Sequence, residues 1–166
     1  MKKILSGFLM AIVLLSACIK SNDVNQSSCS ASYDPCALKA SAAEIDSVEL
    51  YLASKGITDA VKHCSGMYYK IDTVGTGKTA SLCSVIYVKY TGQLTNGTVF
   101  DQQATNAVAF SLSQLIAGFK NCIPLIKEGG SIHLYVPPSL GFGSQQNGTI
   151  PPNSMLIFQV SLVAVQ

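Results

Sequence analysis

The sequence of 166 residues offers few side chains for acid–base, nucleophilic or metal chemistry. It has two histidines, His63 and His133, and neither Trp nor Arg. A hydrolase needs a nucleophile, an activating base and an orienting group within hydrogen-bond reach. His133 lies between Ile132 and Leu134 in an apolar run, which is more typical of a histidine on the solvated face of a strand. Because no CxxC spacing occurs and a single His63-Cys64 pair is a poor ligand set, we expect no metal site.

A glycine-rich segment, residues 74–79, is similar to the end of a phosphate-binding loop. That motif needs a glycine five residues before Gly77, but this position holds Asp72, whose carboxylate would repel phosphate. The residues after Lys78 also favour a strand rather than a helix. We therefore expect a glycine turn between strands here, and no cofactor.

The charge balance argues against a nucleic-acid partner. Eleven lysines oppose nine acidic residues, and Lys2 and Lys3 account for the net charge of +2. Nucleic-acid binding needs a clustered basic face, which this chain lacks. With 48% hydrophobic and 12% charged residues, the chain is too apolar for a disordered tail, and its length allows one substantial domain with accessories.

The first 17 residues have the organisation of a secretory signal peptide: a basic start, an apolar run and a small-residue exit. The run is shorter than the roughly 20 residues that a membrane-spanning helix needs. The sequence Leu15-Ser-Ala-Cys18 is similar to the lipobox of bacterial lipoproteins, in which cleavage leaves the cysteine as the lipidated first residue. We expect acyl chains on Cys18 to anchor the mature chain in the bacterial cell envelope. Ile19 follows the cysteine, which favours the outer membrane, facing the periplasm or the surface.

Export would place the remaining cysteines where disulfides are permitted. Their number is odd, so at least one stays free or pairs between chains. Two of them flank the turn-forming Asp34-Pro35 and are the first candidate pair, Cys29 with Cys36. The sequence leaves the full pairing open among Cys29, Cys36, Cys64, Cys83 and Cys122.

Ahead of the main domain, the pattern predicts a tether and one helix. Residues 18–37 are mostly small and polar, which is typical of a linker. In residues 38–64, Ser41 and Glu44 have the spacing of a capping box, and apolar residues follow at helical intervals. We expect an amphipathic helix from Ala42 to Lys55 that docks on the domain or spaces it from the membrane.

From residue 65 the apolar period changes from about 3.6 to 2, so residues 65–166 form the predicted domain. The predicted strands cover residues 67–74, 85–91, 131–136 and 155–165. Asn96-Gly97 between apolar flanks predicts a hairpin. A short helix is expected from Gln114 to Cys122, capped by Ser113 and ended by Pro124. These elements predict an α+β fold with an antiparallel sheet.

Three motifs in this domain resemble those of the FKBP family, the macrolide-binding peptidyl-prolyl isomerases. Residues 87–101, YVKYTGQLTNGTVFD, resemble the tyrosine-to-Phe-Asp signature of the family. Residues 115–119, LIAGF, are similar to the start of its central helix. Residues 136–143, VPPSLGFG, and 150–158, IPPNSMLIF, are similar to its closing loop and strand. Each motif is weak alone, but together they occur in the order and spacing of the family.

The resemblance implies a twisted antiparallel sheet, a half-barrel, wrapped around one short helix with an apolar pocket between them. Phe119 stands where the family usually has Trp, and Phe142 where it usually has Tyr, so both keep the apolar wall and lose a polar donor. The implied catalytic residues are Tyr90, Phe100, Asp101, Ile116, Phe119 and Phe142. The implied substrate-binding residues are Phe110, Leu115, Ile150 and Phe158.

The same resemblance implies a peptidyl-prolyl cis-trans isomerase that acts on X-Pro bonds of unfolded or partly folded exported proteins. Proline isomerisation breaks no bond and needs no nucleophile, base, metal or cofactor, which suits a histidine-poor chain. The alternative is a non-catalytic holdase or protein-binding module with the same fold.

Overall fold

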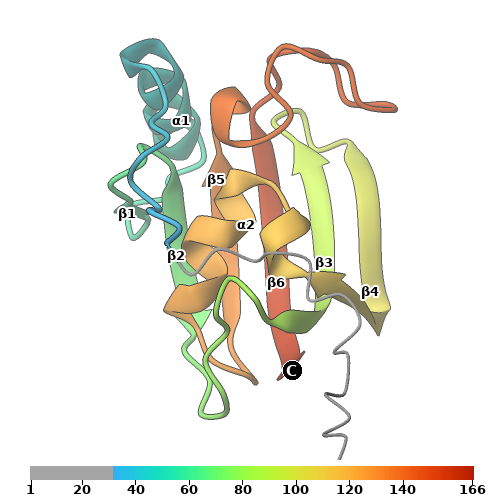
Figure 1. Ribbon diagram of the computed structural model, residues 1–166. Coiled ribbons are helices and arrows are strands. Elements are labelled where there is room, and N and C mark those ends of the chain that lie inside the picture. The colour runs from blue at the N-terminus through green and yellow to red at the C-terminus, as the bar shows by residue number, and fades with distance from the viewer. Residues whose placement is uncertain (1–31) are drawn as a thin grey trace, which may run out of the picture.

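The computed structural model describes residues 32–166. The predicted signal peptide, the lipidation site Cys18 and most of the tether lie outside the described residues. The described part forms a twisted, six-stranded antiparallel sheet in the order β1-β2-β5-β6-β3-β4, which does not close into a barrel (Figure 1). Its strands are β1 (Val61–Lys62), β2 (Tyr68–Thr73), β3 (Val85–Leu94), β4 (Val99–Ser111), β5 (Ser131–Val136) and β6 (Leu156–Val165). Its helices are α1 (Ala42–Ser54) and α2 (Ala117–Cys122), with 3-10 turns η1 (Leu112–Gln114), η2 (Ile123–Leu125) and η3 (Pro138–Leu140).

The predicted α+β class, with a sheet wrapped around a short helix, is confirmed. Side-chain alternation along β6 follows the prediction, because Phe158 and Val160 are buried and Gln159 between them is exposed. The helix α2 crosses the inner face of the sheet (Figure 1). It lies close to β5, because a Cβ atom on Gly118 would come within 2.7 Å of a Val136 methyl carbon.

The helix α1 packs on the opposite face of the sheet. Successive side chains of a strand point to opposite faces, and Leu134 and Val136 of β5 share a core cluster with α2. Tyr135, between them, instead shares a cluster with Val48 and Leu52 of α1. The predicted capping box is confirmed, and the helix ends at Ser54 with Lys55 as its C-cap. One helix thus packs on each face of the sheet, and α1 lies against Tyr135 of β5 and Ile157 of β6.

The central helix is shorter than predicted. Instead of one helix from Gln114, the chain forms η1, then two extended residues, and then α2 from Ala117. The Ser113 hydroxyl lies 3.0 Å from that of Ser111 and makes no cap for α2, so the predicted cap is wrong. The helix ends before Pro124, as expected, and the chain continues as the 3-10 turn η2.

The strand β4 extends far beyond the predicted hairpin. The turn at Asn96-Gly97 is confirmed, and Gly97 has the positive φ of 86° that such a turn requires. After it, β4 runs for 13 residues at the edge of the sheet. Residues 102–106 are all exposed, and their sequence has no alternation of apolar and polar residues, so no strand was predicted there.

The cysteine pairing differs from the first candidate. Cys36 forms a disulfide with Cys64, 28 residues away, so the predicted pairing of Cys29 with Cys36 is wrong. The bond joins the segment before α1 to the turn before β2. Among the described residues, Cys122 has a free thiol, and it is buried 3.6 Å from the Met67 sulfur. Burial raises the pKa of this thiol to about 12, so it stays protonated and unreactive.

Within residues 32–166, no helix has the length and apolar character needed to cross a membrane.

Replacing Leu52 by Ala tests the docking of α1. Leu52 is 5% exposed, and its truncation should lower the free energy of unfolding by about 2–5 kcal/mol, as for other buried leucines. Leu50 on the same helix is 72% exposed, so Leu50→Ala should change stability by less than about 0.5 kcal/mol. Urea unfolding of both variants measures the difference. Equal, small effects would mean that α1 is not packed on the sheet.

Candidate functional site

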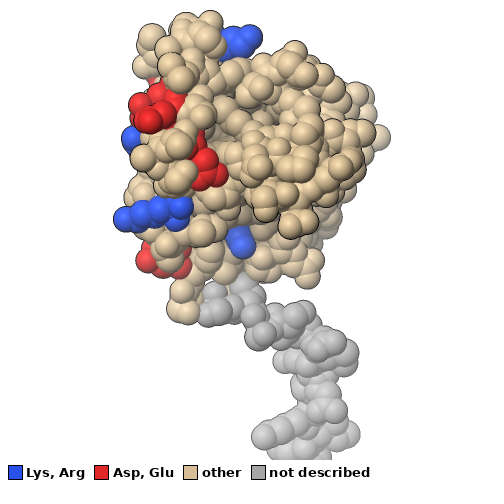
Figure 2. Space-filling view, turned by 90° about the horizontal axis from the view of Figure 1, so that it is seen from above, with Lys and Arg blue, Asp and Glu red and all other residues tan. Residues whose placement is uncertain are grey.

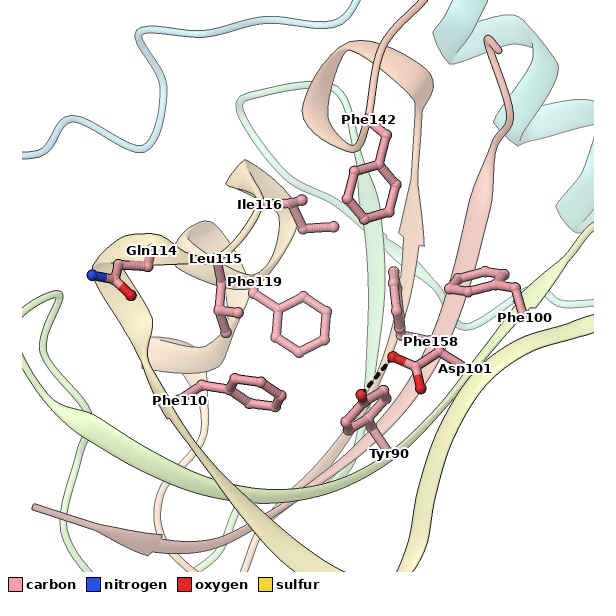
Figure 3. A pocket seen from close by; sticks show the side chains of 10 residues that line it. All are labelled: Tyr90, Phe100, Asp101, Phe110, Gln114, Leu115, Ile116, Phe119, Phe142 and Phe158. Carbon is pink, nitrogen blue, oxygen red and sulfur yellow. Dashed lines mark hydrogen bonds between the residues drawn. The ribbon is translucent and has the colours of Figure 1, made fainter. Parts of the chain in front are cut away.

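A cavity of about 230 Å³ opens between the sheet and the chain around α2 (Figure 3). Six of its lining side chains are aromatic, two are aliphatic and two are polar. They come from β3, β4, β6, the η1–α2 segment and the loop after η3: Tyr90, Phe100, Asp101, Phe110, Gln114, Leu115, Ile116, Phe119, Phe142 and Phe158.

Phe158, near the start of β6, is the ring around which the aromatic wall is packed. Its ring centroid lies 4.9 Å from that of Phe119 and 5.6 Å from that of Phe100, and both pairs meet edge to face. This geometry is favourable because the positive edge of one ring meets the negative face of the other. On another side of the cavity, Tyr90 and Phe110 pack at 6.1 Å between centroids. These rings hold one another in place around the cavity.

Gly92 makes the approach of these rings possible. In the sheet it lies opposite Asp101 of β4 on one side and opposite Phe158 of β6 on the other. A Cβ atom at this position would come within 2.7 Å of the Phe100 ring and 2.8 Å of the Phe158 ring. Any larger residue would therefore push the edge-to-face pair apart.

The two extended residues between η1 and α2 project into the cavity. Leu115 has a ψ of 167° and Ile116 a ψ of 157°, so neither continues a helix. Both side chains face the cavity, with Phe119 one turn further on (Figure 3). The Ile116 carbonyl accepts from the Phe119 and Lys120 N–H groups, whereas no backbone carbonyl of the described residues accepts from the Ile116 N–H.

One hydrogen bond defines the polar rim of the cavity. The Tyr90 hydroxyl donates to the Asp101 carboxylate at 2.6 Å (Figure 3). Burial raises the pKa of Tyr90, and the hydrogen bond to the carboxylate and its negative charge raise it further. The phenol therefore stays protonated and keeps Asp101 turned along the rim. Of the ten lining residues, Asp101 is the one that carries a charge.

The surroundings of the cavity are poor in charge. Between Tyr90 and Gln166 the sequence has four charged side chains, those of Asp101, Lys120, Lys127 and Glu128. In Figure 2 the charged side chains gather at the left, on the side of α1, β1 and β2, while the side over β3 and β4 shows none. A polypeptide that reaches the cavity from this side meets few charges besides that of Asp101.

Nine of the ten side chains named from the sequence lie together around this cavity. Ile150 does not line it; it is buried, and its backbone pairs with that of Asn147 in the turn of the loop. Gln114 also lines the cavity, but it was not predicted from the sequence. It is a polar residue just before the LIAGF segment, and only the path of η1 shows that its side chain reaches the cavity.

The two histidines lie outside the cavity lining. The His133 Nδ1 atom is 2.8 Å from the Asp72 carboxylate, and both side chains are 30% exposed, so His133 belongs to a partly exposed pair between β5 and β2. His63 lies beside the Ser65 hydroxyl at 2.8 Å, and burial lowers the pKa of its ring. No group of three or more possible metal ligands occurs within the described part of the chain.

The cavity can therefore bind and desolvate a small apolar group, but its lining offers no nucleophile paired with a base. The aromatic walls exclude water from a bound ring. The hydrogen-bonding groups at its edge are the Tyr90–Asp101 pair, the Gln114 amide and the N–H of Ile116.

Comparison with curated proteins gives several relatives. The chain is 43% identical over 104 residues to a probable FKBP-type peptidyl-prolyl cis-trans isomerase of Haemophilus influenzae, covering 61% of this chain and 43% of the relative. It is 40% identical over 121 residues to the probable FkpA isomerase of Neisseria meningitidis serogroup B, covering 70% and 44%. Outer membrane protein MIP of Legionella longbeachae is 37% identical over 105 residues, covering 61% and 45%. The chain thus spans less than half the length of these relatives.

Two solved structures share the fold. The crystal structure of FkpA from Escherichia coli superposes with a TM-score of 0.68 at 30% identity, covering 75% of this chain and 60% of that one. The peptidyl-prolyl cis-trans isomerase of Pseudomonas syringae pv. tomato gives 0.65 at 25% identity, covering 75% and 94%. A sequence profile of the family described as FKBP-type peptidyl-prolyl cis-trans isomerase matches residues 77–163, which contain every residue lining the cavity. The chain therefore belongs to the FKBP family.

Proposed function

We propose that this protein is a peptidyl-prolyl cis-trans isomerase that acts on X-Pro bonds of exported proteins. The observation that carries the proposal is the aromatic cavity built around Phe158, whose walls are formed by mutually packed rings. Family membership supports the same activity. No cofactor is required, because the reaction rotates a peptide bond and breaks none.

The proposed mechanism lowers the rotational barrier by removing water. The barrier of about 18–20 kcal/mol comes from the partial double bond of the amide, so uncatalysed X–Pro exchange takes tens of seconds or more. Water stabilises the charge-separated planar amide better than the twisted transition state, in which resonance is lost. A dry aromatic cavity therefore binds the twisted form in preference.

Each part of the cavity has a role in this proposal. Phe119 and the neighbouring rings hold the proline, and Phe142 closes the wall from the loop above (Figure 3). The Ile116 N–H donates to a carbonyl of the substrate that flanks the proline. Tyr90 and Asp101 keep the polar rim in one arrangement through their hydrogen bond.

The charge-poor surface suggests the class of client. Unfolded segments rich in apolar and uncharged polar residues fit a surface on which Asp101 is the charge nearest to the bound proline. Such a surface gives no long-range attraction to either sign of charge.

We further propose that the protein works at the bacterial cell envelope, attached by lipid on Cys18. The support is the lipobox-like sequence that ends at this cysteine and the name of one relative, outer membrane protein MIP of Legionella longbeachae. A lipid anchor would hold the isomerase where newly exported chains fold.

A protease-coupled assay with a proline tetrapeptide tests the activity. Phe100→Ala removes a wall of the cavity and Asp101→Ala removes the acceptor of the Tyr90 hydroxyl, so each should lower kcat/KM at least about tenfold, equivalent to about 1.4 kcal/mol. Val163→Ala, at an exposed position of β6, is the control and should keep the full rate. A folded wild-type protein no faster than buffer would end the isomerase proposal and favour the non-catalytic holdase. Full activity of both cavity variants would refute the assignment of the site.

The salt dependence of the same assay tests the proposed client surface. With an acidic and a basic peptide in turn, raising NaCl from about 50 mM to about 500 mM should change kcat/KM by less than about twofold, because the surface around the cavity has little charge for salt to screen. A steep change with salt for either peptide would contradict recognition through a charge-poor surface.

Mass spectrometry of the protein purified from bacterial membranes tests the anchor. The expected mature chain begins at Cys18 and carries acyl groups, and Cys18→Ser should release the protein from the membrane fraction. A mature chain that retains Lys2 and Lys3, or an unmodified Cys18, would contradict the proposal.

A further inference from the structure

A carboxylate from α1 reaches across to the loop that carries Phe142. The Ser139 N–H donates to Glu44 Oε1 at 2.8 Å, and the Ser139 hydroxyl donates to Oε2 at 3.0 Å. The two residues are 95 positions apart in the sequence. Glu44 lies outside residues 77–163, the part that matches the family profile, so this link joins an accessory helix to the domain that holds the cavity.

The loop from Pro138 to Gly143, hereafter the Phe142 loop, is folded on itself. The Pro138 carbonyl accepts from the Gly141 N–H at 2.9 Å and from the Gly143 N–H at 2.8 Å. The Gly143 carbonyl in turn accepts from the Asn153 N–H at 2.9 Å. Because these bonds tie the two ends of the loop together, a displacement at Ser139 is carried to Phe142.

Glu44 is itself held in place at the start of α1. It occupies the N3 position of the capping box, where the Ser41 N–H and hydroxyl donate to its Oε2 atom at 2.8 and 3.0 Å. The helix behind it is anchored on the sheet by Val48 and Leu52. The Glu44 carboxylate therefore connects a helix that is packed on the sheet to the Phe142 loop.

The ionisation of Glu44 suits this arrangement. Partial burial raises the pKa of its carboxyl, but the hydrogen bonds from the backbone and side chains of Ser41 and Ser139 outweigh that effect and lower the pKa overall. The carboxylate is thus charged at neutral pH, and hydrogen bonds to a charged acceptor are the stronger kind.

We propose that Glu44 is a positioning residue for the cavity: through Ser139 it holds the Phe142 loop so that the Phe142 ring closes the wall above Phe119 and Phe158 (Figure 3). The catalytic meaning of this inference rests on the proposed isomerase function. The placement of the ring does not, and it can be measured separately.

A single-tryptophan reporter measures the placement directly. The chain has no Trp, so Phe142→Trp introduces the only indole, near the end of the loop. Adding Glu44→Ala to this variant should increase acrylamide quenching of the indole at least about twofold and shift its emission to longer wavelength, because a ring released from the cavity wall meets water.

Asp46→Ala in the same reporter background is the matched control. It removes an exposed acidic side chain from the same helix and leaves the capping box and both bonds between Glu44 and Ser139 in place. Quenching in the Glu44→Ala reporter equal to that in the Asp46→Ala reporter would overturn the inference.

The unlabelled chain supplies the kinetic test. Glu44→Ala should lower kcat/KM for the proline peptide at least about fivefold relative to Asp46→Ala, since a displaced wall misplaces the substrate. Asp46→Ala, an acidic residue on the same helix, should match the wild type. Glu44→Gln keeps a carbonyl acceptor and should restore part of the rate and of the indole shielding, and it carries the test if the alanine variant does not fold. A wild-type protein without isomerase activity would refute the proposed function, whereas the indole readings would still decide the placement of the loop.

Discussion

The edge-to-face packing of Phe158 with Phe100 and Phe119 is the interaction on which the cavity depends. It requires a strand residue without a side chain beside it, which Gly92 supplies, and a helix close enough to the sheet to bring Phe119 within reach, which Gly118 permits. Phe119 of α2 and Phe158 of the sheet belong to the buried core and also line the cavity, so the stability of the core and the shape of the site depend on the same side chains.

Most of the charged side chains of the described residues lie away from this cavity. The ion pairs of the described residues, Lys62 with Glu49, Lys70 with Asp59 and His133 with Asp72, all lie on the side of α1, β1, β2 and β5. At the cavity, the Asp101 carboxylate is engaged by the Tyr90 hydroxyl. The proposed desolvation mechanism would need such a separation, because a free charge at the wall would draw water into the cavity.

The fold was predictable from the sequence where the hydrophobic period was regular. Three predicted patterns correspond to observed elements: the capping box and apolar spacing of α1, the alternation of β6, and the Asn-Gly turn. The pattern failed where an element is exposed or depends on distant contacts. The edge strand β4 has no alternation over residues 102–106, and the LIAGF segment reads as helix although its first two residues are extended toward the cavity. The Cys36–Cys64 bond joins segments that only folding brings together.

The sequence by itself determined the family motifs, the aromatic inventory of the site and the shortage of charge around it, because these are properties of residue type and local spacing. The tertiary structure decided which of those residues face one another. It placed Ile150 in the core rather than at the cavity, added Gln114 to the lining, and connected Glu44 of the accessory helix to the Phe142 loop. Contacts of this kind depend on how the sheet twists and how closely α1 and α2 pack on it. They join residues far apart in the sequence, so local sequence patterns do not predict them.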